Sequence, residues 1–302
     1  MKNNILRVVL IAVGAVIGLV VVLVLGAFVT LRLLNRTNGA IVSAGEERGY
    51  LLYVPDSYDP AVPAPLVITI HGLVQWPAHQ EGLSGWNELA DREGFLVVYP
   101  AGTGFPLRWR ANGPDAEPDI AFLTDLIDTL SAEYAIDPAR IYANGLSNGA
   151  GMSFVLGCAL SERIAALGLV GGAYTCPWEA CDPERPVPAI VFHGTDDPVV
   201  PFAGGRSGPL DAPFPVIDEW VDELARHNGC DPDPETLPGS GVVRGVRYSD
   251  CAADVVYYTV EGGGHTWPGG GYLPYWLAGH ITQDIDATEE MWRFFQEHPL
   301  PE

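Results

Sequence analysis

Basic residues are scarce in this chain, and lysine is nearly absent. The 302 residues include 16 Lys and Arg against 38 Asp and Glu, and the only lysine is Lys2. All 38 acidic residues but only twelve of the basic ones lie after Arg36, so this part carries a formal charge of −26. Such a surface lacks the basic footprint that nucleic-acid binding needs, and it disfavours adhesion to anionic lipid.

The sequence also lacks repeats and metal-ligand patterns, which limits the architectures that it could adopt. The chain has no internal repeat and no long low-complexity linker, which excludes a solenoid and favours one globular domain. No group of His, Cys and carboxylate residues has the spacing of metal ligands, so the sequence predicts neither a metal site nor another cofactor. The only compositional break lies near Arg36-Thr37-Asn38-Gly39, and we expect an amino-terminal segment 1–38 and a folded domain 39–302.

The amino-terminal segment is long and apolar. Residues 8–34 contain no charge except Arg32, and the run 8–31 is long enough to span a bilayer. A signal-peptide core is usually only about 7–15 residues long, so we expect an uncleaved transmembrane anchor. Secretion after cleavage, with Val42-Ser43-Ala44 as a poor site, is the alternative. Lys2 and Arg7 precede the span and Arg32 and Arg36 follow it, a slight bias that favours an external domain.

The five cysteines suit an external location. Cys230 and Cys251 flank a Pro/Gly-rich loop and predict one disulfide. The other three offer a second pair, most simply Cys176–Cys181, while Cys158–Cys176 and Cys158–Cys181 remain open. Because five is an odd number, one thiol should stay free.

Strand-like and helical patterns alternate along the folded domain. This alternation predicts an α/β fold with a mostly parallel sheet and helices on both faces. The expected strands are 48–54, 66–70, 95–99, 140–143, 167–170, 189–192 and 255–260, and the expected helices are 86–93, 120–134, 148–160, 215–228 and 288–297.

The strongest local signal is the pentapeptide Gly145-Leu146-Ser147-Asn148-Gly149. It stands between a strand pattern and a helical pattern, the context in which G-x-S-x-G presents a nucleophilic serine. A serine also needs a histidine to take its proton and a carboxylate to orient that histidine. Asp197 and His265 each follow a strand pattern, in the Ser, Asp, His order of α/β-hydrolases. Asp196 is the rival acid, and His280 is the alternative base.

A second loop completes the expected site. The apolar run 66–70 ends in His71-Gly72-Leu73, and we expect the N–H groups of Leu73 and Asn148 to form an oxyanion hole. His71 should shape this turn, and His193 should stabilise the loop of the acid. Three aromatic residues near the base are candidates either for substrate contacts or for ordinary loop packing: Trp267, Tyr272 and Trp276.

These segments together resemble the secreted esterases grouped with polyhydroxybutyrate depolymerases and feruloyl esterases (carbohydrate esterase family one). The likeness spans residues 49–299. It implies the α/β-hydrolase fold, here preceded by one transmembrane helix, with Ser147 as nucleophile, Asp197 as acid and His265 as base. One departure is Pro118-Asp119, where members of the family often have two adjacent aspartates.

The resemblance implies an extracytoplasmic serine carboxylesterase that acts on small-molecule or polymeric esters through an acyl-enzyme. Two alternatives use the same scaffold. One is a peptidase or acyltransferase with the same triad, and the other is a non-catalytic binding protein at the cell surface.

Overall fold

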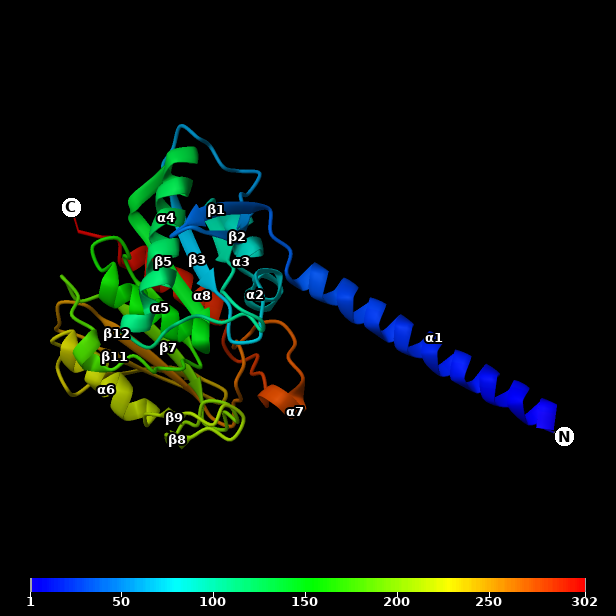
Figure 1. Cartoon of the computed structure of the whole chain (residues 1–302). Coiled ribbons are helices and arrows are strands. Elements are labelled where there is room, and N and C mark those ends of the chain that lie inside the picture. Colours follow the sequence, from blue (N-terminus) through cyan, green and yellow to red (C-terminus); the bar gives the residue numbers. More distant parts are fainter. Residues whose placement is uncertain (1, 302) are drawn as a thin grey trace.

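The computed structural model describes residues 2–301, which form one long isolated helix and one α/β domain (Figure 1). Helix α1 (Lys2–Leu34) projects away from the domain. Its part Ile11–Thr30 has a mean hydropathy of 2.9 and no residue buried against the domain. By length and composition this helix could cross a membrane, and a signal sequence would have the same character.

One ten-stranded sheet forms the centre of the domain. The strand order is β1-β2-β4-β3-β5-β6-β7-β12-β11-β10, and the five neighbouring pairs from β4 to β12 are parallel. The two edges are antiparallel. The strands of this sheet are β1 (Gly39–Ser43), β2 (Glu46–Tyr53), β3 (Ala64–Ile70), β4 (Leu96–Pro100), β5 (Ile136–Leu146), β6 (Leu167–Val170), β7 (Ala189–Gly194), β10 (Glu235–Ser240), β11 (Val243–Tyr248) and β12 (Val255–Val260).

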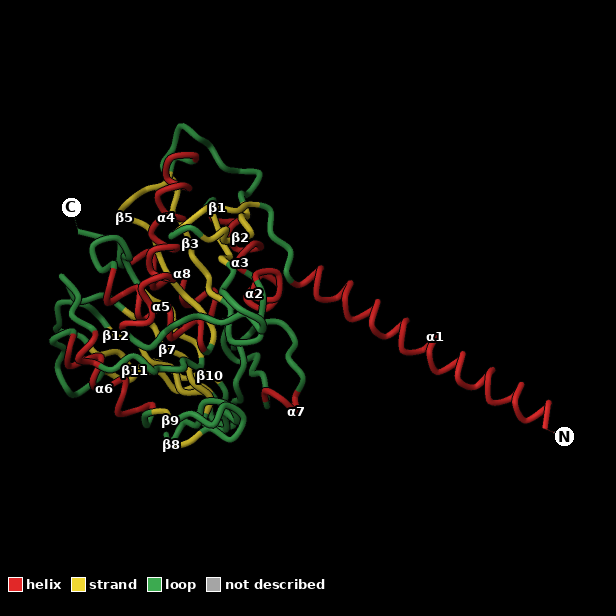
Figure 2. Tube along the Cα trace, viewed as in Figure 1, coloured by secondary structure: helices red, strands yellow, loops and turns green. Residues whose placement is uncertain are grey.

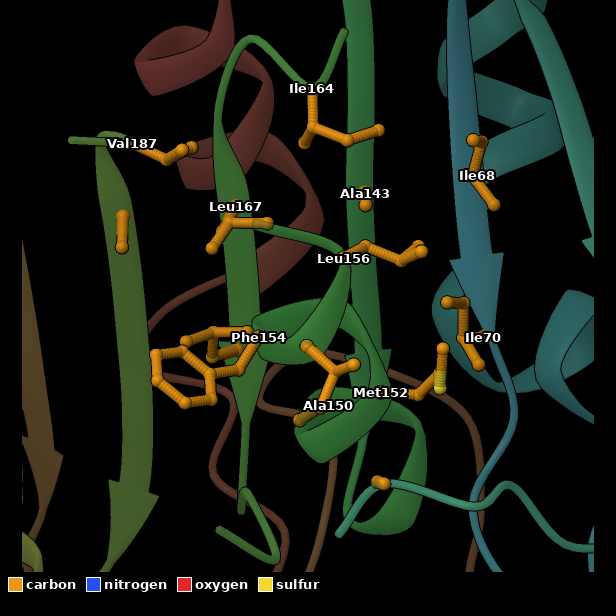
Figure 3. Close-up of a cluster of buried hydrophobic side chains, with 14 of the residues drawn as sticks. Ile68, Ile70, Ala143, Ala150, Met152, Phe154, Leu156, Ile164, Leu167 and Val187 are labelled. Carbon is orange, nitrogen blue, oxygen red and sulfur yellow. The ribbon is translucent and has the colours of Figure 1, made fainter. Parts of the chain in front are cut away.

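Helices cover both faces of the sheet, as Figure 2 shows. The side chains of alternate residues in β3 pack on opposite faces of the sheet, because successive side chains of a strand point to opposite sides. Ile68 and Ile70 pack in one cluster with α4, α5 and α6, whereas Val67 packs in a second cluster with α2, α3 and α8 (Figure 3 draws part of the first). The helices are α2 (Pro77–Ser84), α3 (Trp86–Glu93), α4 (Glu117–Glu133), α5 (Asn148–Ala159), α6 (Ile217–His227), α7 (Tyr275–Ala278) and α8 (Ala287–Glu297).

The predicted fold class is confirmed. Every expected strand and helix has a counterpart, but the sequence did not reveal β1, β10, β11, α2, α7 or the two-residue strands β8 (Gly205–Arg206) and β9 (Pro213–Phe214). Strand β10 was not predicted because it is mostly exposed and contains Pro238 and Gly239, so its sequence lacks the alternation of apolar and polar residues that marks a strand.

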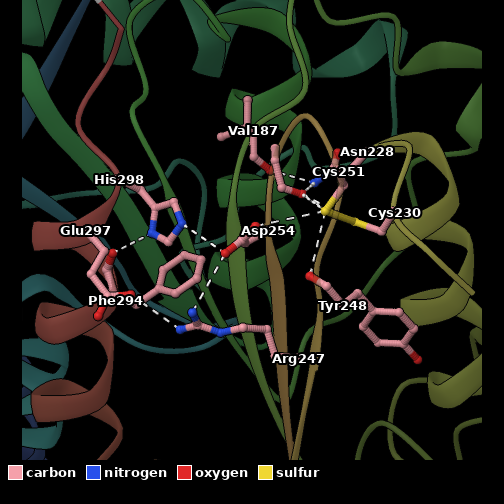
Figure 4. Close-up of polar contacts among 11 residues, drawn as sticks. Val187, Asn228, Cys230, Arg247, Tyr248, Cys251, Asp254, Phe294, Glu297 and His298 are labelled. Carbon is pink, nitrogen blue, oxygen red and sulfur yellow. Dashed lines mark hydrogen bonds and ion pairs between the residues drawn. A yellow bond between two sulfur atoms is a disulfide. The ribbon is translucent and has the colours of Figure 1, made fainter. Parts of the chain in front are cut away.

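Two disulfides close loops at the edge of the domain. Cys230 pairs with Cys251, as predicted, beside the end of α6 (Figure 4). The second pair is Cys158–Cys181, so the simplest expectation, Cys176–Cys181, is wrong. Cys158 lies at the end of α5, with its Cα 4.9 Å from that of Cys181, and Cys176 is left as a buried free thiol.

Candidate active site

A sharp turn joins the central strand β5 to helix α5. Ser147 occupies this turn with φ 59° and ψ −120°, a left-handed conformation that costs a non-glycine residue free energy. Three backbone hydrogen bonds hold it there. The Ser147 N–H donates to Val170 O at 2.9 Å, and Ser147 O accepts from the N–H groups of Gly151 and Ala173 at 3.0 Å. The strain therefore presents the serine side chain at the carboxyl edge of the sheet.

The two glycines of the pentapeptide are required by close packing. A Cβ on Gly145 would lie 2.6 Å from Ile70 O at the end of β3. A Cβ on Gly149 would collide with the same oxygen and lie 2.7 Å from His71 O. The turn thus packs directly on the strand that leads into the expected oxyanion loop.

Asp197 and His265 meet at the ends of the neighbouring strands β7 and β12. The Oδ2 atom of Asp197 lies 2.7 Å from Nδ1 of His265. Its Oδ1 atom accepts hydrogen bonds from the N–H groups of Val199 at 2.8 Å and Val200 at 2.7 Å. Asp196, the rival acid, is exposed and its side chain makes none of these contacts. The geometry therefore joins His265 to Asp197.

Burial and hydrogen bonding act in opposite directions on Asp197. Burial by itself would raise the pKa of Asp197, but the charge and hydrogen bond of His265, aided by His193 and Val200, hold that pKa below its usual range. The Nε2 atom of His193 lies 3.0 Å from Val200 O, so His193 supports the loop of the acid. Burial lowers the pKa of His193.

The turn after β6 brings these groups beside the serine. Gly171 follows Val170, the acceptor of the Ser147 N–H, and it has φ +50°. A Cβ on Gly171 would lie 3.2 Å from Nδ1 of His265 and 3.5 Å from Oδ2 of Asp197. Among the described residues no hydrogen bond joins the Ser147 hydroxyl to His265. Such contacts are often loose without substrate and tighten when it binds.

The loop after β3 carries one expected oxyanion donor, Leu73, and the first residue of α5, Asn148, is the other. The Gly72 N–H donates to Oε1 of Gln75 at 2.8 Å, which fixes the turn. Within the described part of the chain, the N–H groups of Leu73 and Asn148 donate to no protein acceptor. Val74 has φ 61°, a second strained position beside Leu73. Both N–H groups are therefore available to a ligand.

His71 supports this loop from within the core. Burial lowers the pKa of His71 to about 4, so its ring is neutral at pH 7. Nε2 accepts the Gly102 N–H at 3.0 Å, which leaves the proton on Nδ1 for Gly72 O at 2.8 Å. The ring is fully buried. Its contacts agree with the structural role that we expected.

An open cleft of about 840 Å³ adjoins the serine turn. Asn148 lines it together with Trp109 and two arginines, Arg108 and Arg110. The Asn148 side chain clamps the neighbouring loop, since Oδ1 accepts the Trp109 N–H at 2.7 Å and Nδ2 donates to Trp109 O at 3.0 Å. This clamp was not predicted, because only the backbone of Asn148 had an expected role.

A buried ion pair supports the same loop and was also missed. Asp119 has no exposed surface, and its Oδ1 lies 3.0 Å from Arg48 Nη1. Its Oδ2 accepts the backbone N–H of Arg110 at 2.9 Å. The departure at Pro118-Asp119 was the available signal, because it drew attention to a lone aspartate at the start of α4.

The three aromatic candidates do not line the cleft. Trp267 is completely buried, and its Nε1–H donates to Oγ1 of Thr288, which in turn donates to Ser84 O. It is a packing residue that ties the loop of His265 to α8 and α2. Tyr272 and Trp276 are 79% and 83% exposed and are not among the residues that line this cleft.

A mostly parallel sheet with a strained serine turn between a central strand and a helix defines an α/β-hydrolase. Residues 48–181 match the family described as esterase PHB depolymerase. The putative esterase NocK of Nocardia uniformis subsp. tsuyamanensis is 32% identical over 266 residues, which cover 80% of this chain and 76% of that protein. The chain belongs to the PHB depolymerase family of esterases, and it is a carboxylesterase.

One further sequence relative and one solved structure are similar over most of the chain. Feruloyl esterase C of Emericella nidulans is 28% identical over 234 residues, covering 75% of this chain and 79% of that protein. The structure of an acetyl xylan esterase from Aspergillus awamori superposes with a TM-score of 0.62 at 16% identity. That superposition covers 85% of this chain and 98% of the other, and it shows a shared fold.

Proposed function

We propose that this carboxylesterase works through Ser147, His265 and Asp197. The Ser147 oxygen attacks the ester carbonyl carbon while Nε2 of His265 takes the hydroxyl proton. The ester C–O bond then breaks, and His265 returns the proton to the leaving alcohol. Water, activated by the same histidine, finally hydrolyses the acyl-enzyme and releases the acid.

The observation that carries this proposal is the bond of 2.7 Å between Oδ2 of Asp197 and Nδ1 of His265. It holds the proton of the neutral imidazole on Nδ1 and leaves Nε2 free to accept the proton of Ser147. Because the other carboxylate oxygen is held by two backbone N–H groups, the acid cannot turn away.

The N–H groups of Leu73 and Asn148 are proposed to bind the oxygen that becomes negative during the attack. Both are free of protein acceptors among the described residues, and Asn148 is the first residue of α5, where the helix dipole favours an anion. Loss of one such donor typically costs about a hundredfold or more in rate.

Hydrolysis of a small ester panel by the full chain, beside Ser147→Ala, tests the proposal. The panel holds short and medium p-nitrophenyl esters, methyl ferulate and a hydroxybutyrate oligomer. We expect activity that the variant lacks, and the preferred ester distinguishes a feruloyl esterase from a hydroxyalkanoate esterase. Equal rates for both proteins would refute the role of Ser147.

We also propose that α1 anchors the domain outside the cytoplasm. The apolar span Ile11–Thr30 and the two disulfides support this location, because structural disulfides form in oxidising compartments. Intact mass measurement of the protein from membranes tests retention of α1. A mature protein that begins after residue 38 would instead indicate a cleaved signal.

A further inference from the structure

Exposed apolar side chains gather around α7. Tyr272, Tyr275 and Trp276 are between 72% and 83% exposed, and Leu277 is 50% exposed. In Figure 1, α7 (orange) projects from the same side of the domain as that from which α1 departs. Neighbouring exposed aromatic rings of this kind mark an interaction surface rather than ordinary solvent-facing positions.

A second exposed group lies where α1 meets the domain. Phe105 and Val74 are 82% and 50% exposed. Phe105 and Trp76 line a cavity of about 540 Å³ together with Phe28, which belongs to the apolar span of α1. The exposed residues of the two groups are here named the aromatic rim: Val74, Phe105, Tyr272, Tyr275, Trp276 and Leu277.

The loops that carry the aromatic rim contain no carboxylate. Residues 60–80, 94–114 and 262–283 include neither Asp nor Glu, although the chain after Arg36 has a formal charge of −26. Glu81, which follows the first of these ranges, is ion-paired with Arg36, two residues after the end of α1. The acidic charge of the domain is therefore absent from the segments that carry the aromatic rim.

We propose that the aromatic rim lies in the headgroup region of the bilayer that α1 spans, an inference that rests on the proposed anchored location. Tyr and Trp rings favour this region, because they have an apolar body and a polar atom. The absence of carboxylates removes the repulsion and desolvation cost that the rest of the domain would meet there.

This docking surface borders the candidate site on two sides. Val74 directly follows Leu73, and the His265 N–H donates to Ala278 O at the end of α7 at 2.6 Å. Docking therefore brings the oxyanion loop and the base to the boundary between lipid and water. The substrate class that reaches the site there is an amphiphilic ester dissolved in the bilayer.

Quenching of tryptophan fluorescence by brominated phosphatidylcholine tests the docking. The full chain is reconstituted into phosphatidylcholine vesicles beside Trp276→Phe and a matched control, Trp178→Phe, whose ring stacks on His227 away from the rim. We expect quenching of the wild type that falls in Trp276→Phe and persists in the control. Equal quenching of all three proteins, or none, would overturn the proposal.

A kinetic comparison separates docking from the esterase reaction. In W276S/L277S we expect at least about a tenfold lower rate on a long-chain ester within the vesicles, with unchanged hydrolysis of a short soluble ester. An equal loss on both esters would contradict docking. If the wild type in detergent has the mass of two chains and the variant that of one, the aromatic rim instead binds a second copy of the chain. If no ester is cleaved, the proposed function fails, and the quenching result still decides the docking.

Discussion

Replacing Asp197 by Asn should reverse one hydrogen bond while it keeps the shape of the side chain. The two backbone N–H groups of Val199 and Val200 need an acceptor, so the amide oxygen must take the place of Oδ1. The amide nitrogen then stands where Oδ2 lies, 2.7 Å from Nδ1 of His265, and donates a hydrogen bond to it. The imidazole proton moves to Nε2, which can no longer accept the proton of Ser147.

This change of tautomer should lower kcat for a p-nitrophenyl ester by about 10⁴, or about 5.5 kcal/mol in activation free energy. The matched control is Asp196→Asn, because that neighbouring carboxylate is exposed and should alter the rate by no more than about twofold. Initial rates at saturating ester, together with melting curves that show both variants folded, give the comparison. A rate for Asp197→Asn within about tenfold of wild type, or an equal loss in the control, would refute this reasoning.

Three further changes test the surroundings of the site. Asp119→Asn leaves the buried guanidinium of Arg48 without its carboxylate, so denaturant melts should show a loss of about 3–5 kcal/mol in the free energy of unfolding. The control Asp128→Asn removes an exposed ion pair and should cost about 1 kcal/mol or less. Similar losses in the two variants would contradict the role of the buried pair. Gly149→Ala forces a methyl group against the end of β3, and we expect ester hydrolysis to fall at least about a hundredfold; an active variant would show that the turn can relax. Burial lowers the pKa of His71 from 6.5 to about 4, so the unfolded chain takes up its proton first as the pH falls. As the pH falls across that interval, His71 should by itself cost the folded wild type about 3 kcal/mol of stability. The free energy of unfolding of His71→Gln should therefore depend less steeply on pH. An unchanged slope would exclude His71 as a cause of acid unfolding.

The sequence predicted those features that depend on short local patterns. Buried parallel strands such as β3 are mostly apolar runs, and the serine turn has its own glycine pattern, so both were predicted to within a few residues. The exposed edge strand β10 and the four-residue helix α7 have no comparable local pattern. Their positions depend on pairing with β11 and on contacts with the loop of His265.

Side-chain direction in loops was the least predictable property. Trp267 lies two residues after His265, which suggested a place in the cleft, yet the loop turns its ring into the core. The bond between Asn148 and Trp109 and the pair between Asp119 and Arg48 each join segments far apart in the chain. Contacts of this kind follow from the tertiary fold and leave no periodic trace in the sequence.

The hydrogen bonds from Trp267 to Thr288 and from Thr288 to Ser84 join residues as much as 204 positions apart. Thr288 belongs to α8, which leaves the ribosome after every other helix that the structure describes. The loop of His265 therefore lacks this support until α8 has been synthesised. With His265 as the proposed base, we therefore expect hydrolysis to begin only after α8 has docked against this loop.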